Sequence, residues 1–221
     1  MRRSIAIVIG ALLALLVAAP MAFGQVADNS VASEQARALS AAWWPWALEK
    51  STAASPLNGS YEDGSQCGGQ AANGSAQDVW FLAGTITGEK VERTCTVPAG
   101  RKIFFPVFNI LDYNVPGAQS EEELQEEVVG WTNDALAHPK RPLFVTVDGE
   151  PVEMNRLDSP SDLFHYTLQK GDYLTDFGVE PGPYVGVTDG VWVTLPPLSE
   201  GNHTVHFGGN GQNNTYNLNV E

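Results

Sequence analysis

The histidines and carboxylates are the side chains that could carry acid–base or metal chemistry, and their spacing keeps them apart. His203 and His206 lie three positions apart in a segment that alternates like a β-strand. Successive side chains of a strand point to opposite faces, so the two imidazoles cannot share a metal ion unless a bulge intervenes. No serine occupies the Gly-x-Ser-x-Gly elbow of a hydrolase. We therefore expect neither a transition metal nor a Ser–His–Asp triad.

A second group with chemical potential follows a strongly apolar run. Asn109, Asp112 and Tyr113 predict a loop that brings an amide, a carboxylate and a phenol together, as in many binding loops. The alternative is a turn in which Asn109 and Asp112 bond to their own backbone. A carboxylate pair for glycoside cleavage cannot be selected among 26 acidic residues. Asn109, Asp112, Tyr113, His203 and His206 are thus ligand-binding candidates, and no catalytic residue is assigned.

Cys67 and Cys95 are the two cysteines of the chain, and we expect them to form a disulfide. No histidine lies between them and their spacing matches no zinc pattern. Closing such a loop stabilises a fold by ~3 kcal/mol in the chain-entropy model. The stretch from Asn58 to Asp63 looks like a calcium loop but has Asp63 where an EF-hand has glycine. No cofactor is expected, with calcium as the alternative.

The first 24 residues have the layout of a secretory signal peptide. Arg2 and Arg3 precede an apolar run over 5–19, and small residues at 22 and 24 mark a cleavage site before Gln25. The run is short of the ~20 residues that a membrane span needs. We expect residues 1–24 to be removed, the protein to be secreted or periplasmic, and the mature chain to contain no membrane span.

The formal net charge of −14 limits the classes of partner that the protein can bind. An acidic surface repels nucleic acid and anionic lipid, so we exclude both. The acidity could serve solubility, adaptation to salt or the binding of divalent ions, and composition does not choose among them.

Two helices are expected. Residues 25–52 form an N-terminal helical segment that Pro45 should break or restart, with Trp43, Trp44 and Trp46 at the junction. Three tryptophans could form a sugar-stacking platform, but we favour a role in fixing the helix to a sheet, because each buries a large apolar area.

The second helix should span 119–138. Ser120 and Glu123 make a capping box, and the neighbouring glutamates suit the start of a helix. Four residues fall at helical spacing and predict one apolar stripe: Leu124, Val128, Trp131 and Ala135.

The rest of the chain reads as short strands between turns. Residues 79–85 are apolar on both alternating faces, which predicts a strand covered on both sides. Pro106 places the strand over 103–108 at an edge or at a bulge, and Asp148-Gly149 predicts a hairpin turn. Further strands are expected over 93–97, 162–168, 190–195, 203–207 and 215–220, with loop over 169–188. We predict a mainly β fold: an antiparallel, jelly-roll-like β-sandwich over 53–221, with the N-terminal helix and one inserted amphipathic helix.

Several blocks of the chain resemble those of a family of secreted bacterial proteins without an established function. The blocks are CGGQAANGSAQDVWFLAGT, RTCTVPAGRKIFFPVFN, VTVDG and DGVWVTLPPLSEGNHTVHFGG. They occur in the family's order and cover most of the chain from Cys67 to Gly209. The resemblance implies export and pairing of Cys67 with Cys95, and it supplies no reaction.

The favoured hypothesis is an exported, non-catalytic binding or structural module of the cell envelope or extracellular space. Its partner would be a glycan, a small ligand or an envelope protein. The alternative is a secreted hydrolase or lyase with a carboxylate or histidine site, which a cleft uniting the five candidate residues would favour. A calcium-stabilised structural module is the third hypothesis, and a chelator would destabilise it.

Overall fold

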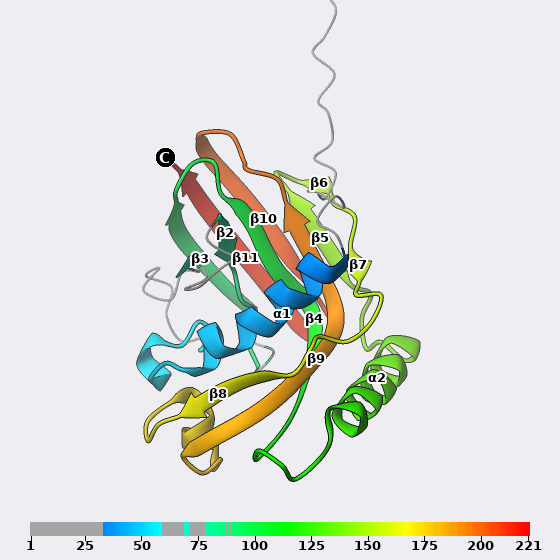
Figure 1. Ribbon diagram of the computed structural model, residues 1–221. Coiled ribbons are helices and arrows are strands. Elements are labelled where there is room, and N and C mark those ends of the chain that lie inside the picture. The colour runs from blue at the N-terminus through cyan, green and yellow to red at the C-terminus, as the bar shows by residue number, and fades with distance from the viewer. Residues whose placement is uncertain (1–32, 59–68, 71–77, 87, 89) are drawn as a thin grey trace, which may run out of the picture.

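The computed structural model describes residues 33–58, 69–70, 78–86, 88 and 90–221. They form two β-sheets packed face to face, with two helices beside them, which confirms the mainly β sandwich with helical additions (Figure 1). The predicted signal peptide, the first residues of the N-terminal segment, Cys67 and most of the calcium-like stretch lie outside the described residues. No helix in the described part of the chain is long and apolar enough to cross a membrane.

The first sheet is built around one long antiparallel pair. That pair is β4 (Lys102–Asn114) with β9 (Gly182–Leu195). Its shorter members are β1 (Gly69–Gln70), β2 (Val79–Phe81), β7 (Asn155–Arg156) and β8 (Phe164–Leu168). The strand order is β1-β2-β4-β9-β7, and β8 also pairs with β9.

The second sheet has the order β3-β11-β10-β5-β6. Its strands are β3 (Lys90–Val97), β5 (Phe144–Val147), β6 (Glu150–Pro151), β10 (Gly201–Gly209) and β11 (Gln212–Val220). The hairpin expected at Asp148-Gly149 is confirmed, with Asp148 at φ 52°.

The sheets are mixed rather than purely antiparallel. The strand β2 pairs with β4 in parallel, and β3 pairs with β11 in parallel. Local patterns report which residues are strands, whereas the direction of a pair depends on how the chain returns, so the sequence-based prediction was wrong for these two pairs. Strand β9 also begins at Gly182, inside the stretch expected to be loop.

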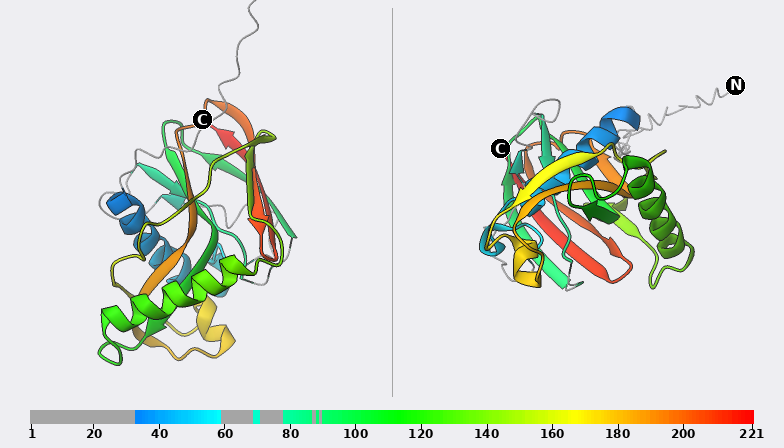
Figure 2. Two further views of the ribbon diagram at one scale, coloured as in Figure 1. Left: turned by 90° about the vertical axis from the view of Figure 1, so that its right-hand side faces the viewer. Right: turned by 60° about the horizontal axis from the view of Figure 1, so that its bottom comes forward.

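The apolar segment over 79–85 is interior, as expected. Val79 and Phe81 join the cluster between the first sheet and the N-terminal helix, whereas Leu82 joins the cluster between the sheets. Phe105 and Phe207 meet across the two sheets with ring centroids 4.5 Å apart. In the left view of Figure 2, the second sheet and the first helix lie on opposite sides of β4 and β9.

Helix α1 (Ser33–Leu48) contains Pro45 without a break, which corrects the expected interruption. Proline removes one backbone hydrogen bond, but packing of the flanking side chains holds the helix in place. Trp43 is 1% exposed, donates from Nε1 to the Leu82 carbonyl at 2.9 Å and meets Trp192 edge to face. The tryptophans therefore fix the helix to the sheet, as predicted.

Helix α2 (Glu121–Ala137) begins with the expected capping box of Ser120 and Glu123, and His138 is its C-cap. Its buried residues are Leu124, Val128 and Thr132, and Trp131 is 49% exposed. The predicted apolar stripe was therefore wrong at Trp131. The row of residues four apart, Leu124, Val128 and Thr132, faces β9 instead. Leu124 and Val128 of α2 pack on Val185 and Val187 of β9. The helix thereby covers the part of β9 that extends beyond the second sheet.

Candidate functional site

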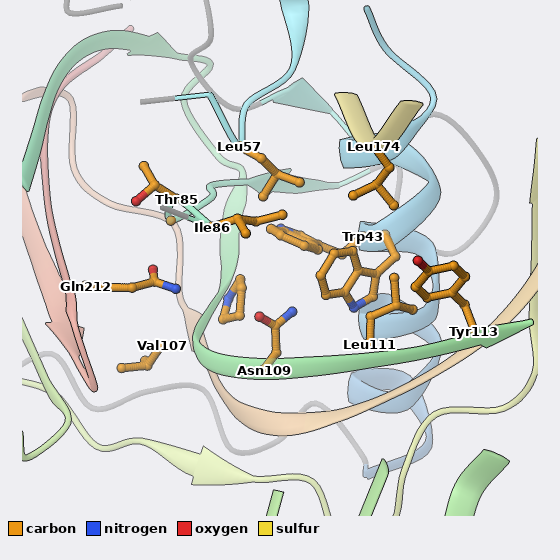
Figure 3. Close-up of a pocket in the computed structure, with 13 residues that line it drawn as sticks. Trp43, Leu57, Thr85, Ile86, Val107, Asn109, Leu111, Tyr113, Leu174 and Gln212 are labelled. Atoms are coloured by element: carbon orange, nitrogen blue, oxygen red, sulfur yellow. The ribbon is translucent and has the colours of Figure 1, made fainter. Parts of the chain in front are cut away.

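A pocket of about 290 Å³ lies between α1, β4 and the segment that follows β2 (Figure 3). Its walls are mostly apolar or aromatic, and no described residue of the lining carries a charge. The lining residues are Trp43, Trp44, Leu57, Gly84, Thr85, Ile86, Pro106, Val107, Asn109, Leu111, Tyr113, Leu174 and Gln212. Concave apolar sites with a few polar groups are the usual form of a small-ligand site.

A bulge in β4 decides which side chains face this pocket. The pairing of β4 with β9 shifts between Pro106 and Phe108, so of the two alternatives that Pro106 left open, an edge strand or a bulge, the structure confirms the bulge. Before the shift, Phe104 packs toward α1 and Phe105 packs between the sheets. After it, Asn109 lines the pocket, because one extra residue exchanges the two faces of a strand.

Gly190 permits this close passage of the two strands. A Cβ at this position would lie 2.3 Å from the Phe108 carbonyl oxygen and 2.6 Å from the Asn109 Cα. Such contacts are not tolerated, so the bulge and the glycine on the facing strand belong together.

Three side chains of the pocket lining carry buried polar atoms for which the described part of the chain offers no hydrogen-bond partner. They are the Nδ2 of Asn109, the Oγ1 of Thr85 and the Nε1 of Trp44. Thr85 is 1% exposed and Trp44 is 6% exposed, and the Asn109 amide points into the pocket in Figure 3. Buried polar groups are normally paired, so unpaired ones in a pocket indicate where a ligand would bond.

Tyr113 closes the end of the pocket. Its ring meets the ring of Tyr184 at 5.7 Å, edge to face. Burial, with a further contribution from Tyr184, raises the pKa of the Tyr113 phenol above its ordinary value. The hydroxyl is therefore neutral at physiological pH and is suited to hydrogen bonding, not to proton abstraction.

Asp112 lies on the other face of β4, toward α2. The side chain is 6% exposed, and burial together with the nearby Glu127 raises its pKa to about 6. The expected Asn109–Asp112–Tyr113 loop is thus part of a strand, and strand alternation separates the carboxyl from the other two groups. Only Asn109 and Tyr113 of the three reach the pocket.

The two histidine candidates lie on β10 in the second sheet, and they do not meet. His206 Nε2 lies 2.8 Å from Asn213 Oδ1, and its ring packs on Phe144. His203 Nδ1 lies 2.7 Å from Asp148 Oδ2. No group of three metal-ligating side chains occurs among the residues that the structure describes.

Ser199, in the segment between β9 and β10, completes a Ser–His–Asp contact, with its Oγ 3.1 Å from His203 Nε2. The same nitrogen lies 3.0 Å from the Ser199 backbone carbonyl. Nδ1 of His203 thus faces a carboxylate, and Nε2 faces both a hydroxyl and a backbone carbonyl. A general base must offer Nε2 as a free acceptor, and here the Ser199 carbonyl competes with the hydroxyl for that nitrogen, so we interpret the contact as one that joins β10 to the segment before it.

Arg93 is a fully buried residue beside the pocket that sequence reasoning did not single out. Its Nη1 donates to the Ala83 carbonyl at 2.9 Å, and its Nη2 donates to the carbonyls of Pro56 at 2.9 Å and Asn58 at 3.3 Å. The guanidinium also bonds to the Tyr216 hydroxyl and packs 5.4 Å from that ring's centroid. The sequence contained the indication: Arg93 occupies an apolar phase of the alternating strand KVERTCTV.

Comparison with known proteins adds little to these observations. No family model and no curated protein matches the chain. Among solved structures, PbICP-C in complex with falcipain-2 is similar over 64% of this chain and 98% of that chain, at 10% identity and a TM-score of 0.23. A likeness at that level carries no argument about fold or function. The resemblance to the secreted bacterial family stays a prediction, and the class is defined by the structure alone: a two-sheet β protein with a pocket beneath its first helix.

Proposed function

We propose that this chain is an exported, non-catalytic binding protein that holds a small ligand with an apolar body in the pocket beneath α1. The observation that carries the proposal is the combination of an apolar cavity with buried donors that have no partner in the described structure. Protein interiors are close-packed, whereas the walls of this partly open pocket lack the contacts that a filled interior would give them. Filling it with a ligand would recover those contacts.

The pocket is held by regular elements, which favours binding by a preformed site. Trp43 is anchored to the Leu82 carbonyl, and Asn109 and Leu111 belong to the central strand β4. Arg37 anchors α1 through its ion pair with Asp162 and a 2.9 Å bond from Nε to the Pro160 carbonyl. Rigid walls reduce the entropy lost when a ligand binds.

The positions of the candidate residues argue for binding over hydrolysis. The alternative of a secreted hydrolase or lyase requires a base and an acid or nucleophile at one site. Asn109 and Tyr113 line the pocket, Asp112 faces α2, and His203 and His206 lie on the second sheet. No single region of the fold therefore unites the five candidates.

The proposal is tested by titrating the protein with three probes that share a phenyl body: phenylacetate, phenylacetamide and phenethylamine. Tryptophan fluorescence and the indole N–H resonances of a ¹⁵N-labelled sample report binding, because Trp43 and Trp44 line the pocket. We expect at least one probe to bind and to shift the Trp44 resonance. Absence of any shift up to about 10 mM, a concentration that detects affinities near −3 kcal/mol, would refute a small-ligand pocket.

A blocking variant and a matched control locate the binding. Ile86 lines the pocket and is 52% exposed, so Ile86→Trp adds bulk at the rim without disturbing the core. Val115 is 51% exposed and lies outside the pocket lining, so Val115→Trp adds the same bulk elsewhere. Loss of binding in the first variant alone supports the pocket, whereas equal binding in both places the probe at another site.

Export is a separate part of the proposal and has its own test. Expression of the full chain in a bacterial host, followed by fractionation and N-terminal sequencing, should give a periplasmic or secreted protein that begins at Gln25. An uncleaved chain retained in the cytoplasm would contradict export and would leave the pocket proposal unchanged.

A further inference from the structure

We infer that the ligand of this pocket is a small monocarboxylic acid, bound as the carboxylate by the Asn109 amide and the Trp44 indole N–H. The inference rests on the proposed binding function and specifies the chemistry of the ligand. Three features of the pocket support it: the polarity of the unpaired atoms, the charge behind the pocket wall and the apolar character of the walls.

The unpaired atoms of the lining are predominantly donors. An indole Nε1 can only donate a hydrogen bond, and an amide Nδ2 has two donors and no acceptor. The hydroxyl of Thr85 can supply a third donor. A carboxylate is the small organic group that offers acceptors alone, and hydrogen bonds to an ionised acceptor are about twice as strong as neutral ones.

The local electrostatics also favours an anion, although the whole chain has a formal charge of −14. No described lining residue is charged, and Arg93 lies directly behind the wall. Its guanidinium bonds to the carbonyls of Ala83 and Pro56, whose neighbours in the chain, Gly84 and Leu57, line the pocket. No carboxylate among the described residues pairs with this buried cation. Among the described residues its charge is therefore balanced by carbonyl and hydroxyl dipoles alone, which leaves a net positive charge behind the wall.

The same features disfavour other ligand classes. A phosphate or sulfate needs a cationic side chain or several backbone N–H groups in direct contact, and no lysine or arginine is among the described lining residues. A sugar presents hydroxyls that donate as well as accept, and it would need matching acceptors. The aromatic walls formed by Trp43, Trp44 and Tyr113 instead suit an apolar body, and the volume of about 290 Å³ lies at the small end of ligand sites.

Isothermal titration with the three probes tests the inference at neutral pH. Phenylacetate should bind about tenfold or more tightly than phenylacetamide, since one charge-assisted bond is worth roughly 1.4 kcal/mol over a neutral one. Phenethylamine, which is a cation, should bind more weakly than both. Equal affinity for all three would overturn the carboxylate inference and leave the binding function intact, whereas no binding by any probe would overturn both.

Variants at Asn109 show whether the preference arises at this site. Asn109→Asp keeps the shape but replaces the donor by an acceptor, and it should abolish the preference for phenylacetate over phenylacetamide. Asn109→Leu should remove it too, with the melting temperature measured to confirm folding. The matched control is Asn202→Leu, at an exposed position on β10, which should leave all three affinities unchanged. A preference that persists in Asn109→Asp refutes the assignment.

Discussion

Replacing the buried Arg93 by methionine should destabilise the fold by about 2–4 kcal/mol, because each hydrogen bond from a charged group contributes about 1.5–3 kcal/mol and the losses are not additive. The substitution removes bonds to the carbonyls of Ala83, Pro56 and Asn58 and to the Tyr216 hydroxyl. Ala83 keeps one partner, since the Tyr216 hydroxyl also donates to its carbonyl at 2.8 Å. Methionine fills most of the vacated volume and removes the cost of burying a charge, which limits the loss.

Urea denaturation followed by far-ultraviolet circular dichroism measures this loss. A decrease of about 3 kcal/mol corresponds to a melting temperature lower by about 10 °C for a chain of this size. Arg93→Lys should lie between the parent and Arg93→Met, because one ammonium cannot reach carbonyls on two segments. The exposed Arg141 provides a control, and Arg141→Met should change the free energy of unfolding by less than about 0.5 kcal/mol. If Arg93→Met lowers the free energy of unfolding no more than the control does, then Arg93 does not stabilise the contact of β3 with the two segments that contain Ala83 and Pro56.

Asp112→Asn should stabilise the protein by about 1–3 kcal/mol at pH 8 and have little effect near pH 4, since a difference of one pKa unit is worth about 1.4 kcal/mol. The pKa of Asp112 is raised from 3.8 to about 6, so the folded state favours the protonated acid and loses stability as the pH rises from about 4 to about 6. Thermal denaturation of both proteins across this range measures the effect, and a difference that does not grow with pH would contradict it. Separately, thiol labelling of the denatured, unreduced protein should find no free thiol at Cys67 or Cys95. Two labelled cysteines would refute the predicted disulfide.

Elements coded by local sequence were predicted well. The start of α2 depends on contacts within one turn, so Ser120 and Glu123 were sufficient to place it. The strand expected over 79–85 was recognised because apolar residues occupy both of its faces, although the strand itself ends at Phe81. Pro106 indicated a bulge because proline cannot donate a hydrogen bond to a neighbouring strand.

Predictions that depended on distant partners were less successful. Pro45 should have interrupted α1, but the burial of Trp43 and Leu48 against the sheet holds the helix together. Trp131 fits the apolar spacing of α2 and yet is half exposed, since the orientation of the helix is set by its contact with β9. Arg93 was overlooked because its hydrogen-bond partners lie on segments far away in the chain.

The sequence by itself determined which elements and side chains are available to the site: apolar strands, a helix rich in tryptophan, and the Asn109 amide and Tyr113 phenol that follow Pro106. Only the tertiary structure decided which of them meet. Side chains alternate along a strand with a period of two, so one bulged residue between Pro106 and Phe108 turns Asn109 and Tyr113 toward the pocket and Asp112 toward α2. Pro106 marks where the strand pairing is interrupted, but the register with β9 decides which residue becomes the extra one.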